Sequence, residues 1–112
     1  MKWKDLIAEI PSLSANGGSD AELTSVEYDS RRVRKGSVFV AMRGGSNDGN
    51  RYVKKALEAG AVGIITDFAL TVDYLTVYRP DVGVLEVEHG RRALAAAKDK
   101  IRELFWEVVE GR

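Results

Sequence analysis

Hydrophobic residues near the start of the chain recur at the spacing of a helix. The apolar positions that follow the i, i+3, i+4, i+7 rule are Trp3, Leu6, Ile7 and Ile10. Pro11 and the Ser-, Asn- and Gly-rich run behind it are helix-breaking and turn-forming residues. We therefore expect a short amphipathic helix over residues 3–10, followed by a loop over residues 12–21.

Four short segments rich in β-branched and apolar residues predict strands further along the chain. They cover residues 23–28, 37–42, 61–66 and 82–87. The second of them contains an uninterrupted apolar run from Val38 to Met42, which is typical of a strand that is buried on both faces. We therefore expect this strand to lie at the centre of a sheet.

A helix is predicted over residues 50–59, between the second and third strands. Its apolar positions are Tyr52, Val53, Ala56 and Leu57. Asp48 or Asn50 can act as the N-cap, and Gly60 is placed to end the helix. A strand, a glycine-rich turn, a helix, a tight turn and a strand over about thirty residues are typical of a βαβ unit with parallel strands.

The last segment, residues 91–110, follows Gly90 and is rich in strong helix formers. One stripe of this helix should pack on the sheet; it consists of Leu94, Ala97, Ile101, Leu104, Phe105 and Val108. Trp106 falls about 150° from the centre of that stripe, on the face expected to meet solvent. The pattern predicts one α/β domain over residues 1–112, with three layers, a mostly parallel central sheet and a long C-terminal helix.

The charged residues are balanced and interspersed. The chain has 17 Lys and Arg residues and 17 Asp and Glu residues, so it lacks the basic field that drives binding to nucleic acid or anionic membranes. It has no cysteine, which excludes disulfides and thiolate metal sites and agrees with a reducing compartment. No stretch approaches the ~20 apolar residues of a membrane span, and we expect a cytoplasmic protein.

A glycine-rich loop at residues 44–50 is the first candidate for chemistry. It joins the carboxyl end of the expected central strand to the start of a helix, which is where open α/β sheets bind ligands. Its glycines allow close approach of the backbone, and the N–H groups of the first helical turn favour an anion such as a phosphate. The loop lacks the Lys-Ser/Thr ending of a Walker A motif, so an ordinary turn remains the alternative.

A second candidate is the turn that follows the first strand, from Tyr28 to Arg32. Its hydroxyl, carboxylate and guanidinium groups can converge on the same edge of the sheet, and a polar turn with an Asp–Arg pair is the alternative. His89 is the single histidine, and neither it nor the carboxylates form a catalytic or metal-binding constellation. We therefore expect no catalytic residue, no metal and no cofactor.

These segments together resemble the amino-terminal domain of MurE-type Mur ligases. The resemblance covers roughly residues 1–95 and rests on the order and spacing of several blocks: Tyr28–Arg31, Lys35–Ala41, Gly44, Asp48–Gly49, Tyr52, Ala56 and Gly60–Ala61. In that family the domain holds the uridine diphosphate end of a UDP-N-acetylmuramoyl-peptide. A separate central domain binds ATP, and a third domain binds the incoming amino acid.

The resemblance also implies which residues meet the ligand. The residues that it places at the UDP are Tyr28, Ser30, Gly45, Ser46 and Asn47. It implies that Asp29 and Arg31 brace the turn instead. A Mur ligase needs a Gly-Lys-Thr phosphate loop, a carbamylated lysine and Mg²⁺ ligands, none of which this sequence supplies. The resemblance thus implies an isolated substrate-anchoring domain in peptidoglycan precursor synthesis, which binds its ligand weakly and has no ligase activity alone.

The resemblance fades over residues 96–112, which form the end of the long helix. Strong helix formers and the i, i+4 pair of Arg102 and Trp106 favour an alternative, in which the helix of an engineered scaffold presents a binding surface. Tryptophan is enriched at interface hot spots, so Arg102, Trp106 and Val109 are the candidate contacts for a protein partner or for self-association.

Overall fold

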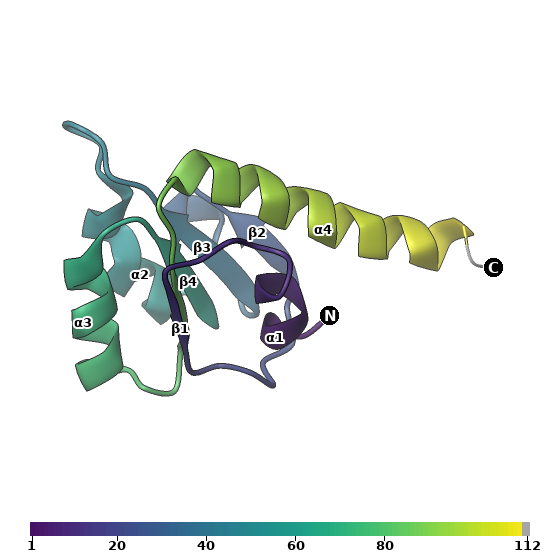
Figure 1. Ribbon diagram of the computed structural model, residues 1–112, viewed down its shortest axis with the longest axis horizontal. Coiled ribbons are helices and arrows are strands. Elements are labelled where there is room, and N and C mark those ends of the chain that lie inside the picture. Colours follow the sequence, from purple (N-terminus) through teal and green to yellow (C-terminus); the bar gives the residue numbers. More distant parts are fainter. Residues whose placement is uncertain (111–112) are drawn as a thin grey trace.

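A five-stranded sheet forms the middle layer of the molecule, and helices cover both of its faces (Figure 1). The computed structural model describes the backbone of residues 1–110 and the side chains of residues 1–103. Its elements are α1 (Trp3–Ile7), β1 (Ser14–Asn16), β2 (Ser25–Glu27), the 3-10 turn η1 (Ser30–Arg32), β3 (Ser37–Ala41), the 3-10 turn η2 (Gly49–Tyr52), α2 (Val53–Glu58), β4 (Gly63–Thr66), α3 (Ala69–Tyr78), β5 (Gly83–Glu86) and α4 (Gly90–Glu110).

The sheet is mostly parallel and has the strand order β1-β5-β4-β3-β2. Strands β2, β3, β4 and β5 run parallel to one another, and β1 pairs antiparallel with β5. All five residues of β3 are buried, and β3 with α2 and β4 forms the expected βαβ unit. The predicted three-layer α/β fold is therefore confirmed.

Alternation along the strands divides the core between the two faces of the sheet. Phe39 and Ile64 point to the face that α2 and α3 cover, whereas Val38 and Ile65 point to the face that α1 and α4 cover. All four side chains are fully buried. Because both faces are covered, the strands carry almost continuous apolar runs, as expected for a parallel sheet.

The long helix α4 packs on the sheet through its first three turns and then continues past the sheet (Figure 1). Ala93 and Ala97 are buried, and Leu94 and Ile101 are partly buried against the same core. The predicted apolar stripe is confirmed over this part of the helix. Its remaining members, Leu104, Phe105 and Val108, lie outside the described side chains.

The indole of Trp3 closes one face of the sheet over two glycines. Trp3 is fully buried, and a Cβ atom added to Gly83 would lie 2.5 Å from its ring; a Cβ at Gly63 would clash with the ring as well. The two glycines therefore leave a slot in β4 and β5 into which the ring fits. Among the described side chains, the indole Nε1 is a buried polar atom without a hydrogen-bond partner.

Two elements differ from the sequence-based expectation. The loop expected over residues 12–21 contains β1, whose backbone pairs with β5 although Ser14–Asn16 carries no strand pattern. The pattern also predicts no element for residues 67–81, where the structure has α3. This helix is apolar on both faces: Val72 and Leu75 are buried, while Leu70 and Val77 are exposed, so it shows no amphipathic period.

Candidate functional site

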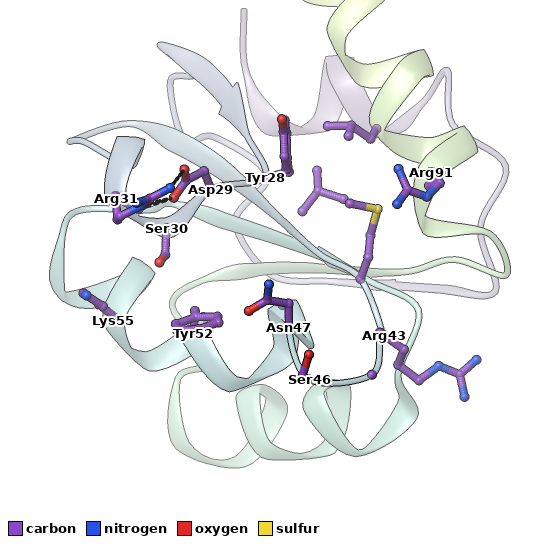
Figure 2. A pocket seen from close by; sticks show the side chains of 16 residues that line it. Tyr28, Asp29, Ser30, Arg31, Arg43, Ser46, Asn47, Tyr52, Lys55 and Arg91 are labelled. Carbon is purple, nitrogen blue, oxygen red and sulfur yellow. Dashed lines mark hydrogen bonds and ion pairs between the residues drawn. The ribbon is translucent and has the colours of Figure 1, made fainter.

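A cleft of about 1040 Å³ lies at the carboxyl ends of β2 and β3. It is lined by the turn after β2, the glycine-rich loop after β3, the first part of α2 and the start of α4 (Figure 2). The structure brings together in this cleft all five residues implied for the nucleotide: Tyr28, Ser30, Gly45, Ser46 and Asn47. Parallel strands explain the convergence, because their carboxyl ends meet at one edge of the sheet.

Asp29 and Arg31 pair with each other in the turn after β2. The Asp29 carboxylate accepts hydrogen bonds from the Arg31 backbone N–H at 3.0 Å, from its Nε at 3.0 Å and from its Nη2 at 2.8 Å. These bonds to the guanidinium and backbone of Arg31 lower the pKa of Asp29 to about 2. The two groups are engaged with each other, and Ser30 between them lies at the edge of the cleft (Figure 2).

The glycine-rich loop offers unused backbone N–H groups. Within the part of the chain that the structure describes, no hydrogen bond occupies the N–H of Gly45, Ser46 or Asn47. A Cβ atom added at Gly45 would meet nothing within 4 Å, so the loop is open to the cleft at this residue. Arg51 contacts the loop through a hydrogen bond, in which its Nη1 donates to the Ser46 carbonyl at 3.3 Å.

The N–H groups of the first helical turn are not available to a ligand, contrary to expectation. The Gly49 N–H donates to the Met42 carbonyl at 2.8 Å, and the Asn50 N–H donates to the Asp48 carboxylate at 2.9 Å. The Arg51 N–H donates to the Asp48 carbonyl at 3.1 Å. Asp48, one of the two predicted candidates, is thus the N-cap, and together with the Met42 carbonyl it accepts the donors that a phosphate would need.

Asn50 connects the end of the loop to the elements that follow. Its Oδ1 accepts hydrogen bonds from the hydroxyls of Thr66 at 2.6 Å and Thr71 at 2.7 Å. Its Nδ2 donates to the Asp48 carboxylate at 3.0 Å. The side chain therefore joins η2 to the end of β4 and to the first turn of α3.

Comparison with known proteins identifies the family. A family model described as "Mur ligase family, catalytic domain" matches residues 22–101, which is more than half of the chain. This chain belongs to the Mur ligase family. The match includes the turn after β2, the glycine-rich loop and the first part of α4, so every segment that lines the cleft lies within it.

The relatives of this Mur ligase domain are ligases named for 2,6-diaminopimelate. The chain is 41% identical over 101 residues to UDP-N-acetylmuramoyl-L-alanyl-D-glutamate--2,6-diaminopimelate ligase of Chlorobium phaeobacteroides, an alignment with 87% of this chain and 19% of that protein. It is 30% identical over 110 residues to the ligase of the same name from Clostridium tetani, covering 91% and 22%. The chain thus spans about a fifth of the length of these relatives.

Solved structures of Mur ligases share the fold. MurF from Thermotoga maritima in complex with ADP matches with a TM-score of 0.50 and 30% identity over 69% of this chain and 16% of that one. MurF from Acinetobacter baumannii matches with a TM-score of 0.51 and 22% identity over 66% and 15%. The family match continues through residue 101, beyond the expected end of the resemblance. Nothing in these comparisons supports an engineered scaffold.

Two cations of this Mur ligase domain line the cleft without having been singled out in the sequence. Lys55 comes from α2 and Arg91 from the start of α4, and Figure 2 shows them on opposite sides of the cleft. Neither forms an ion pair with any residue that the structure describes. Arg43 also lines the cleft, but its Nε lies 3.7 Å from Asp67 and its side chain points outward. Lys55 and Arg91 lie on the surfaces of two different helices, and no local sequence pattern indicated that they would line the same cleft.

Tyr28 stands at the border between the turn and α4. Its side chain is 57% exposed, and the Lys98 Nζ lies 5.4 Å from the centroid of its ring. A cation at this distance interacts favourably with the face of an aromatic ring. Tyr52, which the resemblance includes but the site prediction omits, lines the cleft from η2.

The remaining candidates lie apart from the cleft. His89 is exposed in the turn before α4, and Arg102 is exposed with its Nη1 3.7 Å from Asp99. Trp106 and Val109, the other contacts of the proposed partner surface, lie outside the described side chains, so that surface stays a prediction. Over the described residues, no group of three or more His, Asp or Glu side chains is placed to hold a metal ion, and no helix is long and apolar enough to cross a membrane.

Proposed function

We propose that the cleft binds the uridine diphosphate part of a UDP-N-acetylmuramoyl-peptide. The observation that carries this proposal is the convergence of the five implied residues around one cavity with Lys55 and Arg91, two cations that form no ion pair with any residue whose side chain the structure describes. The relatives are named for a substrate of this kind, and the segments that line the cleft all lie within the family match.

The charge of the cleft favours an anionic ligand. Four lining residues are cationic, and Asp29 is the single carboxylate among the lining residues of the described chain. That carboxylate is already engaged by Arg31, and its pKa is lowered to about 2, so it stays ionised but compensated. Lys55 and Arg91, together with the free N–H groups of the loop, suit the two phosphates of a diphosphate.

The aromatic residues of the cleft suit the uridine. Tyr28 and Tyr52 border the cavity from different elements, and both are partly exposed. Nucleobases stack on exposed aromatic faces whatever their hydrogen-bonding pattern, which supplies affinity without needing a buried pocket. We therefore assign the base to the tyrosine-lined part of the cleft and the diphosphate to the loop and the cations.

In this proposal the domain anchors substrate and leaves the chemistry to other parts of a Mur ligase. The relatives are named as ligases of UDP-N-acetylmuramoyl-L-alanyl-D-glutamate and 2,6-diaminopimelate, and this chain spans about a fifth of their length. We propose that the domain serves such a ligase in peptidoglycan precursor synthesis, in the cytoplasm. The sequence contains no Gly-Lys-Thr phosphate loop, which supports an anchoring role without ATP-dependent ligation. Affinity for UDP alone should be weak, because the peptide end of the substrate would make its contacts elsewhere.

The proposal is tested by removing the cations one at a time. Lys55→Met and Arg91→Met should each weaken UDP binding by about five- to tenfold, because each removes a charge-assisted contact. Arg92→Met is the matched control, since Arg92 is adjacent on α4 but does not line this cleft. Isothermal titration calorimetry with UDP, UMP and uridine measures the effect.

The ligand series separates the contacts. The loss caused by Lys55→Met and Arg91→Met should be largest for UDP and absent for uridine, which carries no phosphate. Equal affinities of the wild type, Lys55→Met and Arg91→Met for UDP would overturn the proposed function. A wild-type protein that shows no UDP binding at millimolar ligand would overturn it as well.

A further inference from the structure

We propose that Thr71, in α3, is a positioning residue of the ligand-binding loop and acts through Asn50. The inference rests on the proposed function, because it concerns the loop that we assign to the diphosphate. Helix α3 contributes no residue to the cleft. The hydrogen bonds of Asn50 with Thr71 and with Asp48 connect this helix to the end of the loop.

The junction fixes both ends of the Asn50 amide. The carbonyl end accepts two hydroxyls, from Thr66 at 2.6 Å and Thr71 at 2.7 Å. The amino end donates to the Asp48 carboxylate at 3.0 Å, and the Asn50 backbone N–H donates to the same oxygen at 2.9 Å. A carbonyl oxygen has two acceptor sites, so both sites of this one are filled.

The orientation of Asn50 fixes the position of the carboxyl-terminal end of the loop. Asp48 and Gly49 directly follow Asn47, and the Gly49 N–H is anchored on the Met42 carbonyl at 2.8 Å. Asn50 thus holds the carboxyl-terminal end of the loop against the sheet, while Met42 marks the strand end from which the loop departs. With both ends fixed, the free N–H groups between them keep one direction relative to the cleft.

Thr71 is the part of this junction that can be changed without touching the cleft or the sheet. Its side chain is only 8% exposed, and its hydroxyl has Asn50 as its partner. Thr66 also accepts the Phe68 N–H at 3.1 Å, so changing Thr66 would disturb the start of α3 as well. Valine has the shape of threonine, and Thr71→Val therefore removes one donor while the helix keeps its packing.

The same helix provides a matched control. Thr76 is an exposed residue of α3 whose hydroxyl donates to the Val72 carbonyl at 2.8 Å, within the helix itself. Thr76→Val removes a hydroxyl from α3 without reaching the loop. Thr71→Ser keeps a hydroxyl at the junction and serves as the conservative variant.

Two measurements test the inference. Thr71→Val should weaken UDP binding by about three- to tenfold, while Thr71→Ser and Thr76→Val bind like the wild type. Amide hydrogen exchange without ligand should be faster in Thr71→Val at Gly49 and Asn50, whose N–H groups are hydrogen-bonded at the end of the loop, with the exchange of the β3 amides unchanged.

The outcomes distinguish this inference from the proposed function. Unchanged exchange at Gly49 and Asn50 of Thr71→Val, or equal effects of Thr71→Val and Thr76→Val, would overturn the positioning role even if UDP binds. Absence of UDP binding by the wild type would refute the proposed function, whereas faster exchange of these two amides in Thr71→Val alone would still support the junction as the device that orders the end of the loop.

Discussion

The Lys98 ammonium group of α4 lies 5.4 Å from the centre of the Tyr28 ring, at the border of the cleft. Lys98→Met removes the charge but keeps most of the aliphatic stem, and it should weaken UDP binding by about two- to fivefold through loss of the cation–π contact. Lys100→Met is the control, because Lys100 pairs with Glu9 and Glu103 away from the cleft. Calorimetry of both variants measures the effect.

A double-mutant cycle checks whether this contact carries the effect. If Lys98 acts through the ring, Lys98→Met should change UDP affinity much less in a Tyr28→Leu background. Additive losses would mean that Lys98 acts independently of Tyr28.

Two glycines of the loop region should respond differently to alanine. A Cβ at Gly45 meets nothing within 4 Å, whereas a Cβ at Gly49 would lie 2.9 Å from the Met42 backbone N. Gly45→Ala should therefore keep the thermal stability of the wild type but weaken UDP binding, because the methyl group enters the cleft. Gly49→Ala should lower the stability by about 1–3 kcal/mol, as expected when the backbone must shift. Thermal unfolding and UDP titration of both variants check this, and a destabilised Gly45→Ala would contradict it.

The Asp29–Arg31 contact should make part of the stability depend on pH. The pKa of Asp29 falls from 3.8 to about 2 in the folded protein, mainly through hydrogen bonds from Arg31. A lowered folded-state pKa means that the stabilisation is fully present above about pH 3.8 and is lost as the pH falls toward 2. The melting temperature of the wild type should exceed that of Asp29→Asn at neutral pH, and the difference should shrink between these pH values. A difference that stays constant on acidification would contradict this origin.

The slot beneath Trp3 should tolerate no side chain. Gly83→Ala places a methyl group 2.5 Å from the indole, in a core where the ring is fully buried. We expect a loss of about 2–4 kcal/mol in the free energy of unfolding, because the ring or the strand must move. Urea denaturation measures it, and a variant as stable as the wild type would show that the indole has room to shift.

Local sequence information predicted the elements whose signals lie within a few residues. The buried strand from Val38, a cap at Asp48 or Asn50, and the Gly60 stop each depend on one residue or one short pattern; the structure contains the strand and the stop, and its cap is Asp48. Gly60 has a φ of 111°, which glycine adopts without strain. The two candidate loops could be placed at one site because parallel strands end at the same edge.

The sequence could not reveal features that depend on packing between distant segments. Lys55 and Arg91 are exposed cations on separate helices, which is ordinary for helix surfaces, and only the fold puts them across one cleft. The Asn50 junction requires Thr71 of α3, a helix without an amphipathic period. The first-turn N–H groups were expected to bind an anion, but Asp48 and Met42 already accept from them.

The central claim is that the cleft between the turn after β2 and the glycine-rich loop holds UDP. The most direct measurement is a titration of isotope-labelled protein with UDP, followed by NMR at the amides of Ser30, Gly45, Ser46 and Asn47. The account predicts saturable shifts that are confined to these residues and to their neighbours around the cleft, with the α3 amides beyond Thr71 unaffected. A titration that leaves these amides unchanged at millimolar UDP, or that shifts residues away from the cleft instead, would contradict it.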